Sequence, residues 1–144
     1  MDKKKIKSQA TKLNNSKDKI DTNLNDIDYN KRKGRIAFSS VCHNKCSISK
    51  WQGKELTSLI DTFKKIEESK WEDILIDAGL QWKRDKHIAF KLPDNLPEDV
   101  KLHSMRVDGK MRIFGYRAQE YFYIVWFDKN HEVCPEGKNK IHTA

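Results

Sequence analysis

The strongest structural signal in this sequence is the pair Asp108-Gly109, which stands between two apolar runs in the last third of the chain. Asp-Gly flanked by apolar runs is typical of a tight β-hairpin, so residues 102–107 and 111–117 are predicted to be paired strands. A three-residue loop would pair Val107 with Met111 and Met105 with Ile113. We favour this register over a two-residue loop because it separates apolar from polar side chains better.

The predicted register has a consequence for function. Met105, Val107, Met111 and Ile113 would share one face of the hairpin with Gly115. The opposite face, which points away from the helices, would carry two arginines and a tyrosine beside Phe114: Arg106, Arg112 and Tyr116.

Three further segments are predicted to be strands. Residues 121–128 (YFYIVWFD) are apolar on both faces and are expected to form a central strand. Residues 35–41 (RIAFSSV) and 87–92 (HIAFKL) are shorter candidates.

Two helices are expected between these strands. The apolar residues Leu56, Leu59, Ile60, Phe63 and Ile66 recur at the spacing of one helix face. Ser49 and Gln52 suit a capping box at its start, and Ser69 and Glu72 suit a second one that opens a shorter helix ending near Gly79. The element order β-α-α-β-β-β predicts an α+β domain, with two helices packed on a mostly antiparallel sheet.

Charge divides the chain into a tail and a folded domain. The 144 residues suit one domain at roughly 150 residues each. Residues 1–34 hold ten Lys/Arg and five Asp, which is +5 of the net charge of +8, with Tyr29 as their single aromatic. We predict a disordered basic tail over residues 1–34, a domain over 35–138 and a short tail over 139–144. Alternatively, the near-heptad spacing of Ile6, Leu13, Ile20, Leu24 and Ile27 would allow an amphipathic helix on a partner.

The composition also indicates the compartment of the protein and the class of its binding partner. No apolar run approaches the roughly 20 residues that a membrane span needs, so no membrane association is expected. No secretory h-region is visible, which favours the cytoplasm. A positive surplus in a small protein indicates a polyanionic partner, most often a nucleic acid.

The cysteines and the common motifs predict no metal and no cofactor. Cys42-His43-x-x-Cys46 has zinc-ligand types at a compatible spacing, but zinc needs four ligands, and the others would have to come from Cys134, His131 or His142 without a second clean pair. We favour ordinary loop and edge cysteines. No Walker loop, GxGxxG, HExxH or GxSxG is present.

Basic and imidazole groups remain as candidate chemistry. RNA cleavage through attack by the 2′-hydroxyl needs a proton acceptor, a cation beside the phosphorane and an acid for the leaving 5′-oxygen. Arg binds phosphate as a fixed bidentate cation, and His exchanges protons near neutral pH. The opposing interpretation is a solvated strand face with one edge histidine.

A family resemblance favours the chemical interpretation. The segment MRVDGKMRIFGYR (105–117), followed by the apolar strand and then DKNHEVCP (128–135), resembles the C-terminal half of RelE/ParE-superfamily toxins. Those chains read R-x-x-x-Y-R-I-x-Y-R, then an apolar strand ending in H-R or K-R, then V-Y. The resemblance covers residues 35–138 and implies the β-α-α-β-β-β fold of that superfamily. Its ribonuclease branch cuts mRNA, usually within the ribosome, and is neutralised by an antitoxin, whereas its ParE branch acts on DNA gyrase.

The resemblance also implies residue roles. Arg112 matches the arginine placed on the scissile phosphate, Arg106 the basic residue one strand earlier, and His131 the basic or histidine position after the last strand. Tyr116-Arg117 matches the second Y-R, while Cys134 stands where a catalytic tyrosine is often found. Together with the basic balance, this predicts RNA contacts from a wider set: Lys101, His103, Lys110, Lys129, Lys31, Arg32, Lys33 and Arg35.

The leading hypothesis is therefore a metal-independent, RelE-like endoribonuclease that acts on mRNA in a toxin–antitoxin or phage-defence setting. The alternative is a non-catalytic RNA- or protein-binding module on the same fold.

Overall fold

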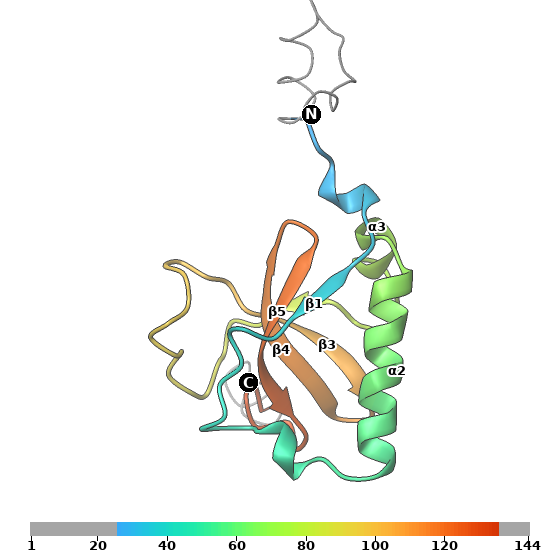
Figure 1. The fold of residues 1–144 in the computed structure, drawn as a ribbon. Coiled ribbons are helices and arrows are strands. Elements are labelled where there is room, and N and C mark those ends of the chain that lie inside the picture. The colour runs from blue at the N-terminus through green and yellow to red at the C-terminus, as the bar shows by residue number, and fades with distance from the viewer. Residues whose placement is uncertain (1–25, 136–144) are drawn as a thin grey trace, which may run out of the picture.

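A computed structural model describes residues 26–135, and its centre is a five-stranded sheet in the order β1-β5-β4-β3-β2 (Figure 1). The strands are β1 (Arg35–Ala37), β2 (Lys83–Arg84), β3 (His103–Asp108), β4 (Met111–Ala118) and β5 (Tyr121–Asp128). β1 runs parallel to β5, and the other neighbours are antiparallel. The α+β class and the mostly antiparallel sheet are thus confirmed, but the described chain has five strands, one more than the predicted β-α-α-β-β-β order contains. Most of the predicted tail (1–25) and the C-terminal tail (139–144) lie outside the described residues.

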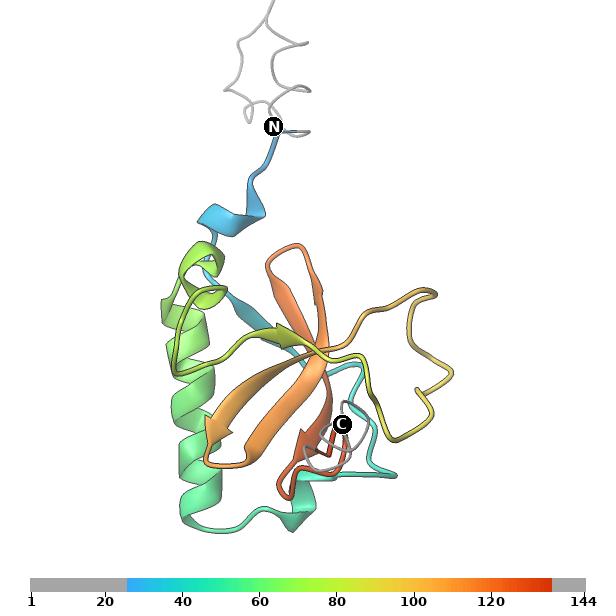
Figure 2. The same cartoon turned by 180° about the vertical axis from the view of Figure 1, so that it is seen from behind.

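One face of the sheet is covered by α2 (Lys54–Glu68), which stands alongside it in Figures 1 and 2. The predicted apolar stripe of α2 is buried only in part, because Leu56 and Ile60 are exposed (37% and 53%) and Phe63 is half-buried. Leu59 and Ile66 have almost no exposed surface. Each of these side chains stabilises the fold by about 1.5–3 kcal/mol. They pack in a main core with Met105, Ile113 and Ile124 from the sheet.

The helix ends differ from the prediction. α2 begins after Gly53, whose φ of +48° suits a residue without a Cβ, and no side chain caps it. Ser47 instead caps the 3₁₀ turn η2 (Ile48–Lys50). The helix α3 is short (Trp71–Ile74) and is capped by no side chain, because the Ser69 hydroxyl donates to the Lys65 carbonyl at the end of α2. Both predicted capping boxes were therefore wrong.

The strand register of the β3–β4 hairpin is the predicted one, but its turn is not. Met105 lies opposite Ile113 as predicted, whereas Asp108 rather than Val107 pairs with Met111, so the loop is the two residues Gly109-Lys110. Val107 is the extra residue of a bulge on β3, which joins this turn to the predicted strand register. Val107 and Met111 still pack against the main core, so the predicted division of the two faces holds.

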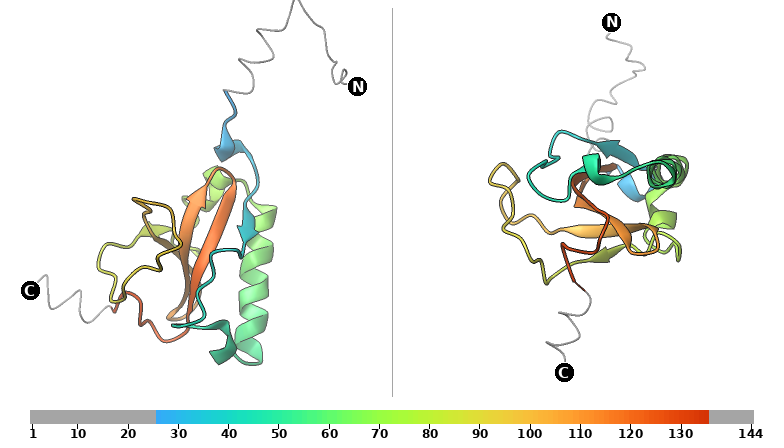
Figure 3. Two further views of the ribbon diagram at one scale, coloured as in Figure 1. Left: turned by 60° about the vertical axis from the view of Figure 1, so that its left-hand side comes forward. Right: turned by 90° about the horizontal axis from the view of Figure 1, so that it is seen from below.

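The face away from α2 is covered as well. The connection between β2 and β3 is a long loop that crosses this face, and residues 87–92 lie within it (Figures 2 and 3). The predicted strand over 87–92 was therefore wrong: the alternating Ile88, Phe90 and Leu92 pack onto a second core around Trp126 and Phe114. Residues 38–41, predicted to extend β1, are a turn and an irregular segment.

The described chain before β1 belongs to the folded body. Residues 26–34 include the 3₁₀ turn η1 (Tyr29–Lys31), and Lys33 forms a bridge with Lys70. Gly34 packs so closely that a Cβ there would lie 2.6 Å from Ile66 Cγ2. The basic cluster 31–35 is thus fixed against α3 and is not part of a loose tail. No helix in the described chain is long and apolar enough to cross a bilayer.

Candidate functional site

Two arginines converge at one end of the sheet. Arg106 and Arg112 are direct cross-strand partners on β3 and β4. Arg106 Nε and Arg112 Nη1 both donate to the Gly109 carbonyl, at 3.2 Å and 3.0 Å, and Arg112 Nη2 reaches Gln81 Oε1 at 3.5 Å. Like charges directly opposite each other are unfavourable, and an anion bound between them would relieve the repulsion. Both side chains are partly exposed, so this pair can receive a phosphate from solvent.

The last residue of β5, Asp128, lies at this same end of the sheet. It lies opposite Arg112 at the end of β5, and its buried carboxylate accepts from the backbone N–H groups of Glu132 (2.9 Å) and Val133 (2.8 Å). The resulting turn carries His131, whose φ of +63° lies in the left-handed region that is uncommon for a side-chain-bearing residue. The sequence-predicted Arg106, Arg112 and His131 are therefore positioned by adjoining ends of β3, β4 and β5.

A buried acid that the sequence did not single out lies near Arg112 and His131. Asp85 follows β2 and is 6% exposed, and its Oδ2 and the neighbouring Ser104 Oγ are both buried without a hydrogen bond of acceptable geometry in the described chain. Burial raises the pKa of Asp85, while the nearby Ser104 hydroxyl and the positive charges of Lys83, Arg112 and His131 act in the opposite direction. Arg112 and His131 are thus both within electrostatic reach of one carboxyl group.

Tyr116 and Arg117 lie elsewhere on β4. The Tyr116 hydroxyl is hydrogen-bonded to Ser40 Oγ at 2.7 Å, and its ring stacks on Tyr123 with centroids 5.0 Å apart. The Arg117 guanidinium lies 4.2 Å from the Trp71 ring centroid and its Nε donates to the Gln119 carbonyl. Burial lowers the pKa of Arg117. The fold therefore places Arg117 near the far end of β4 from Arg112 and holds it against α3.

The residues predicted to contact RNA are spread over several surfaces. Three of them are held in ion pairs: Lys31 with Glu72 (2.9 Å), Arg32 with Glu120 (3.4 Å) and Lys129 with Glu55 (3.1 Å). His103 stacks on Trp82 on the α2 side of the sheet, and burial lowers its pKa. The exposed remainder is Lys33, Arg35, Lys101 and Lys110.

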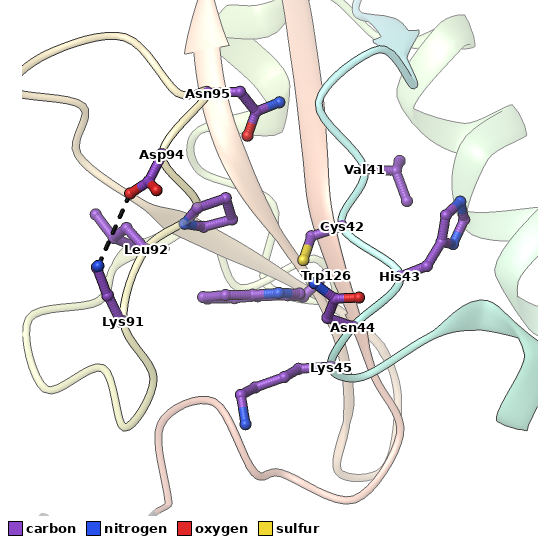
Figure 4. Close-up of a pocket in the computed structure, with 11 residues that line it drawn as sticks. Val41, Cys42, His43, Asn44, Lys45, Lys91, Leu92, Asp94, Asn95 and Trp126 are labelled. Atoms are coloured by element: carbon purple, nitrogen blue, oxygen red, sulfur yellow. Dashed lines mark ion pairs between the residues drawn. The ribbon is translucent and has the colours of Figure 1, made fainter.

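The cysteine segment does not assemble a metal centre. Residues 41–45 and 91–95 face each other across a cavity of about 640 Å³, which Cys42 and Trp126 help to line. The His43 side chain points away from Cys42 (Figure 4). The carboxylates of Asp128 and Glu132, together with burial, raise the pKa of Cys46 to about 12, so its thiol stays protonated. The described residues contain no group of three or more His, Cys, Asp or Glu that could hold a metal ion.

Sequence reasoning missed Asp85 because its neighbours come from distant segments. The only available signal was an acid inside the basic run Lys83-Arg84-Asp85-Lys86. An aspartate in such a run is normally exposed, so the sequence gives no sign that Asp85 is buried.

Comparison of the chain with protein-family models, with curated proteins and with solved structures gives no match.

Proposed function

We propose that this protein is a RelE-like toxin, an endoribonuclease that cleaves mRNA by attack of the 2′-hydroxyl on the adjacent phosphate. The observation that carries the proposal is the convergence of Arg106 and Arg112 on the Gly109 carbonyl, at the end of the sheet where Asp128 positions His131. The α+β element order is compatible with the RelE-like fold that the sequence resembles. Action in the cytoplasm, on ribosome-associated mRNA and under control of an antitoxin, belongs to the same proposal.

In the proposed reaction Arg112 binds the scissile phosphate and stabilises the charge that develops on the phosphorane. Arg106 supplies a second cation to the same phosphate. The 2′-oxygen forms a bond to phosphorus as it loses its proton, and the bond to the 5′-oxygen breaks as that oxygen gains one. His131 serves one of these two proton transfers. The products are a 2′,3′-cyclic phosphate and a 5′-hydroxyl, and no metal ion takes part.

The test is cleavage of a defined mRNA, without ribosomes in the presence of a chelator and with ribosomes in a buffer that contains magnesium. We expect Arg112→Ala and His131→Ala each to lower the rate by about 10²-fold or more, because each removes a group used in the transition state. Lys64→Ala, which removes an exposed charge from α2, is the matched control and should retain the wild-type rate. Mass spectrometry should find the cyclic phosphate end.

Equal rates for the wild type and both site variants would overturn the residue assignment. One observation favours the alternative of a non-catalytic RNA-binding module: Cys134, at the position of the family's tyrosine, is buried in the second core and offers no phenolic hydroxyl to a substrate. RNA binding with a steep salt dependence and no cleavage under any of these conditions would support that alternative.

A further inference from the structure

A second cavity lies at the β2 edge of the sheet and is lined in part by Asp85. It has a volume of about 330 Å³, within the usual range for small-molecule sites. Arg84, Lys86 and Lys101 line it, and all three are exposed. A phosphate group of a bound polyanion would find these cations at the mouth of the cavity.

The remaining wall of this cavity is apolar. Ile88 and Leu92 belong to the loop that covers the sheet, and Leu102 directly precedes β3. Leu102 is buried in the second core, which fixes this wall to the sheet. Such a wall accepts a flat aromatic ring and excludes water from its edge.

Asp85 also lines the cavity and gives it a specific polar group. More than nine-tenths of the residue is buried, and its Oδ2 has no hydrogen-bond partner in the described chain. A buried carboxylate oxygen without a donor is costly, so a ligand that brings donors is stabilised. The cavity thus combines cations at its mouth, an apolar wall and one acceptor group inside.

We propose that this cavity binds the guanine base of an RNA nucleotide, with the Asp85 carboxylate accepting hydrogen bonds from the base and Arg84, Lys86 and Lys101 contacting its phosphates. The proposal rests on RNA being the substrate of the protein. Ser104, whose backbone pairs with Lys83 directly before Arg84 and Asp85, lies on β3, the strand that also carries Arg106, so the cavity and the proposed phosphate site share this strand. The cavity would then determine which sequence is cut.

Guanine is the base that matches a carboxylate. Its Watson–Crick edge presents two adjacent donors, the ring N1–H and the exocyclic amino group, one for each carboxylate oxygen. Adenine and cytosine each place an acceptor beside a single amino donor, and uracil places acceptors on both sides of one N–H. The other bases would leave a buried carboxylate oxygen unpaired, at a cost of about 1–3 kcal/mol, or roughly 5- to 150-fold in affinity.

The test is titration of the full-length protein with the 5′-monophosphates of guanosine, adenosine, cytidine and uridine, followed by NMR or calorimetry. We expect guanosine monophosphate to bind about 10-fold more tightly than the others. Asp85→Asn keeps the shape of the side chain but replaces one acceptor by a donor, so it should remove the guanine preference. Because an amide matches the adjacent donor and acceptor of adenine and cytosine, it should strengthen the binding of adenosine and cytidine monophosphates. Lys101→Ala should weaken all four ligands by a similar factor, since it removes a phosphate contact.

Equal affinity for the four nucleotides, no detectable guanosine monophosphate binding, or an undiminished guanine preference in Asp85→Asn would each overturn the proposal. Lys101→Ala removes only an exposed group, so its nucleotide profile reports on the cavity even if Asp85→Asn fails to fold. Mononucleotide binding requires no cleavage, so the two proposals fail separately. A guanine-selective protein that cuts no RNA would refute the ribonuclease assignment alone, and RNA cleavage without nucleotide selectivity would refute the guanine cavity alone.

Discussion

The charge state of Asp85 links the stability of this protein to pH. Burial raises the pKa of Asp85 in the folded protein above its ordinary value of 3.8, so folding favours the protonated acid. The stabilisation from this preference is fully present below the unfolded pKa and is lost as the pH rises through the folded pKa. Above the folded pKa, the wild-type protein therefore carries the cost of a buried anion.

Asp85→Asn tests this account, because asparagine resembles the protonated acid at every pH. We expect the variant to gain in free energy of unfolding relative to the wild type as the pH rises above 3.8, and the gain to disappear at more acidic pH. Urea unfolding at a series of pH values measures the difference. A difference that does not change with pH would show that Asp85 titrates alike in the folded and unfolded chains.

At the scale of elements, β4 and β5 leave no room for a side chain at the irregularity beside Gly115. The register shifts there between Phe114 and Gly115, and a Cβ on Gly115 would fall on the Tyr123 carbonyl oxygen. The backbone of β5 cannot move away without disturbing the buried Phe122 and Ile124 on either side. The pairing that orients Arg112 and Asp128 thus depends on a position without a side chain.

Gly115→Ala is expected to destabilise the protein by about 2 kcal/mol or more, as overpacking of a tight contact does. Gly109→Asn is the matched control, because no atom lies within 4 Å of a Cβ at Gly109 and asparagine tolerates its φ of +52°. Thermal unfolding followed by circular dichroism compares the two. Equal losses in both variants would mean that the Gly115 contact is relieved by movement of the strands.

Elements with strong local patterns could be predicted from the sequence, and elements defined by distant packing could not. β4 follows from alternation, β5 from its continuous apolar run and the body of α2 from 3.6-residue spacing, and these patterns act within one element. Residues 87–92 alternate like a strand, yet Ile88, Phe90 and Leu92 cover the second core. The bulge at Val107, which shifts the turn to Gly109-Lys110, was not predicted, because it depends on how the two strands pack on the core.

The candidate site divides in the same way. Arg106 and Arg112 were predicted to be neighbours because the hairpin fixes their pairing, and His131 follows at the exit of the adjoining strand. Arg117 is close to Arg112 in sequence, but the ring of Trp71 holds it on α3, and no local pattern indicates that contact. Asp85 escaped prediction because its environment comes from β3, β4 and the turn after β5.

At the scale of the whole molecule, the net charge of +8 predicts salt-dependent binding of RNA. The part that each cation plays depends on whether the fold leaves it available. Lys101 is exposed at the mouth of the proposed guanine cavity, whereas Lys129 is held between Glu55 and the Lys50 carbonyl. The surface cations are therefore unequally available to a polyanion.

Binding of a single-stranded RNA at several salt concentrations tests this distribution. Lys101→Ala should reduce the slope of log affinity against log salt by about 1, because one phosphate contact is lost. Lys64→Ala, on the exposed side of α2, should leave the slope unchanged. Equal reductions in both variants would indicate a diffuse attraction to the whole surface.

The position of β1 in the sheet affects how this protein is made. β1 is an edge strand and pairs only with β5. Residues 35–37 therefore cannot join the sheet until residues 121–123 have been synthesised. Arg112 and His131 are likewise synthesised late, and the cover over the second core closes only when Val133 reaches it. A growing chain still inside the ribosomal tunnel therefore lacks the pairing that orients its site. If the proposed activity is correct, each ribosome completes the toxin before the toxin can act on that ribosome's own message.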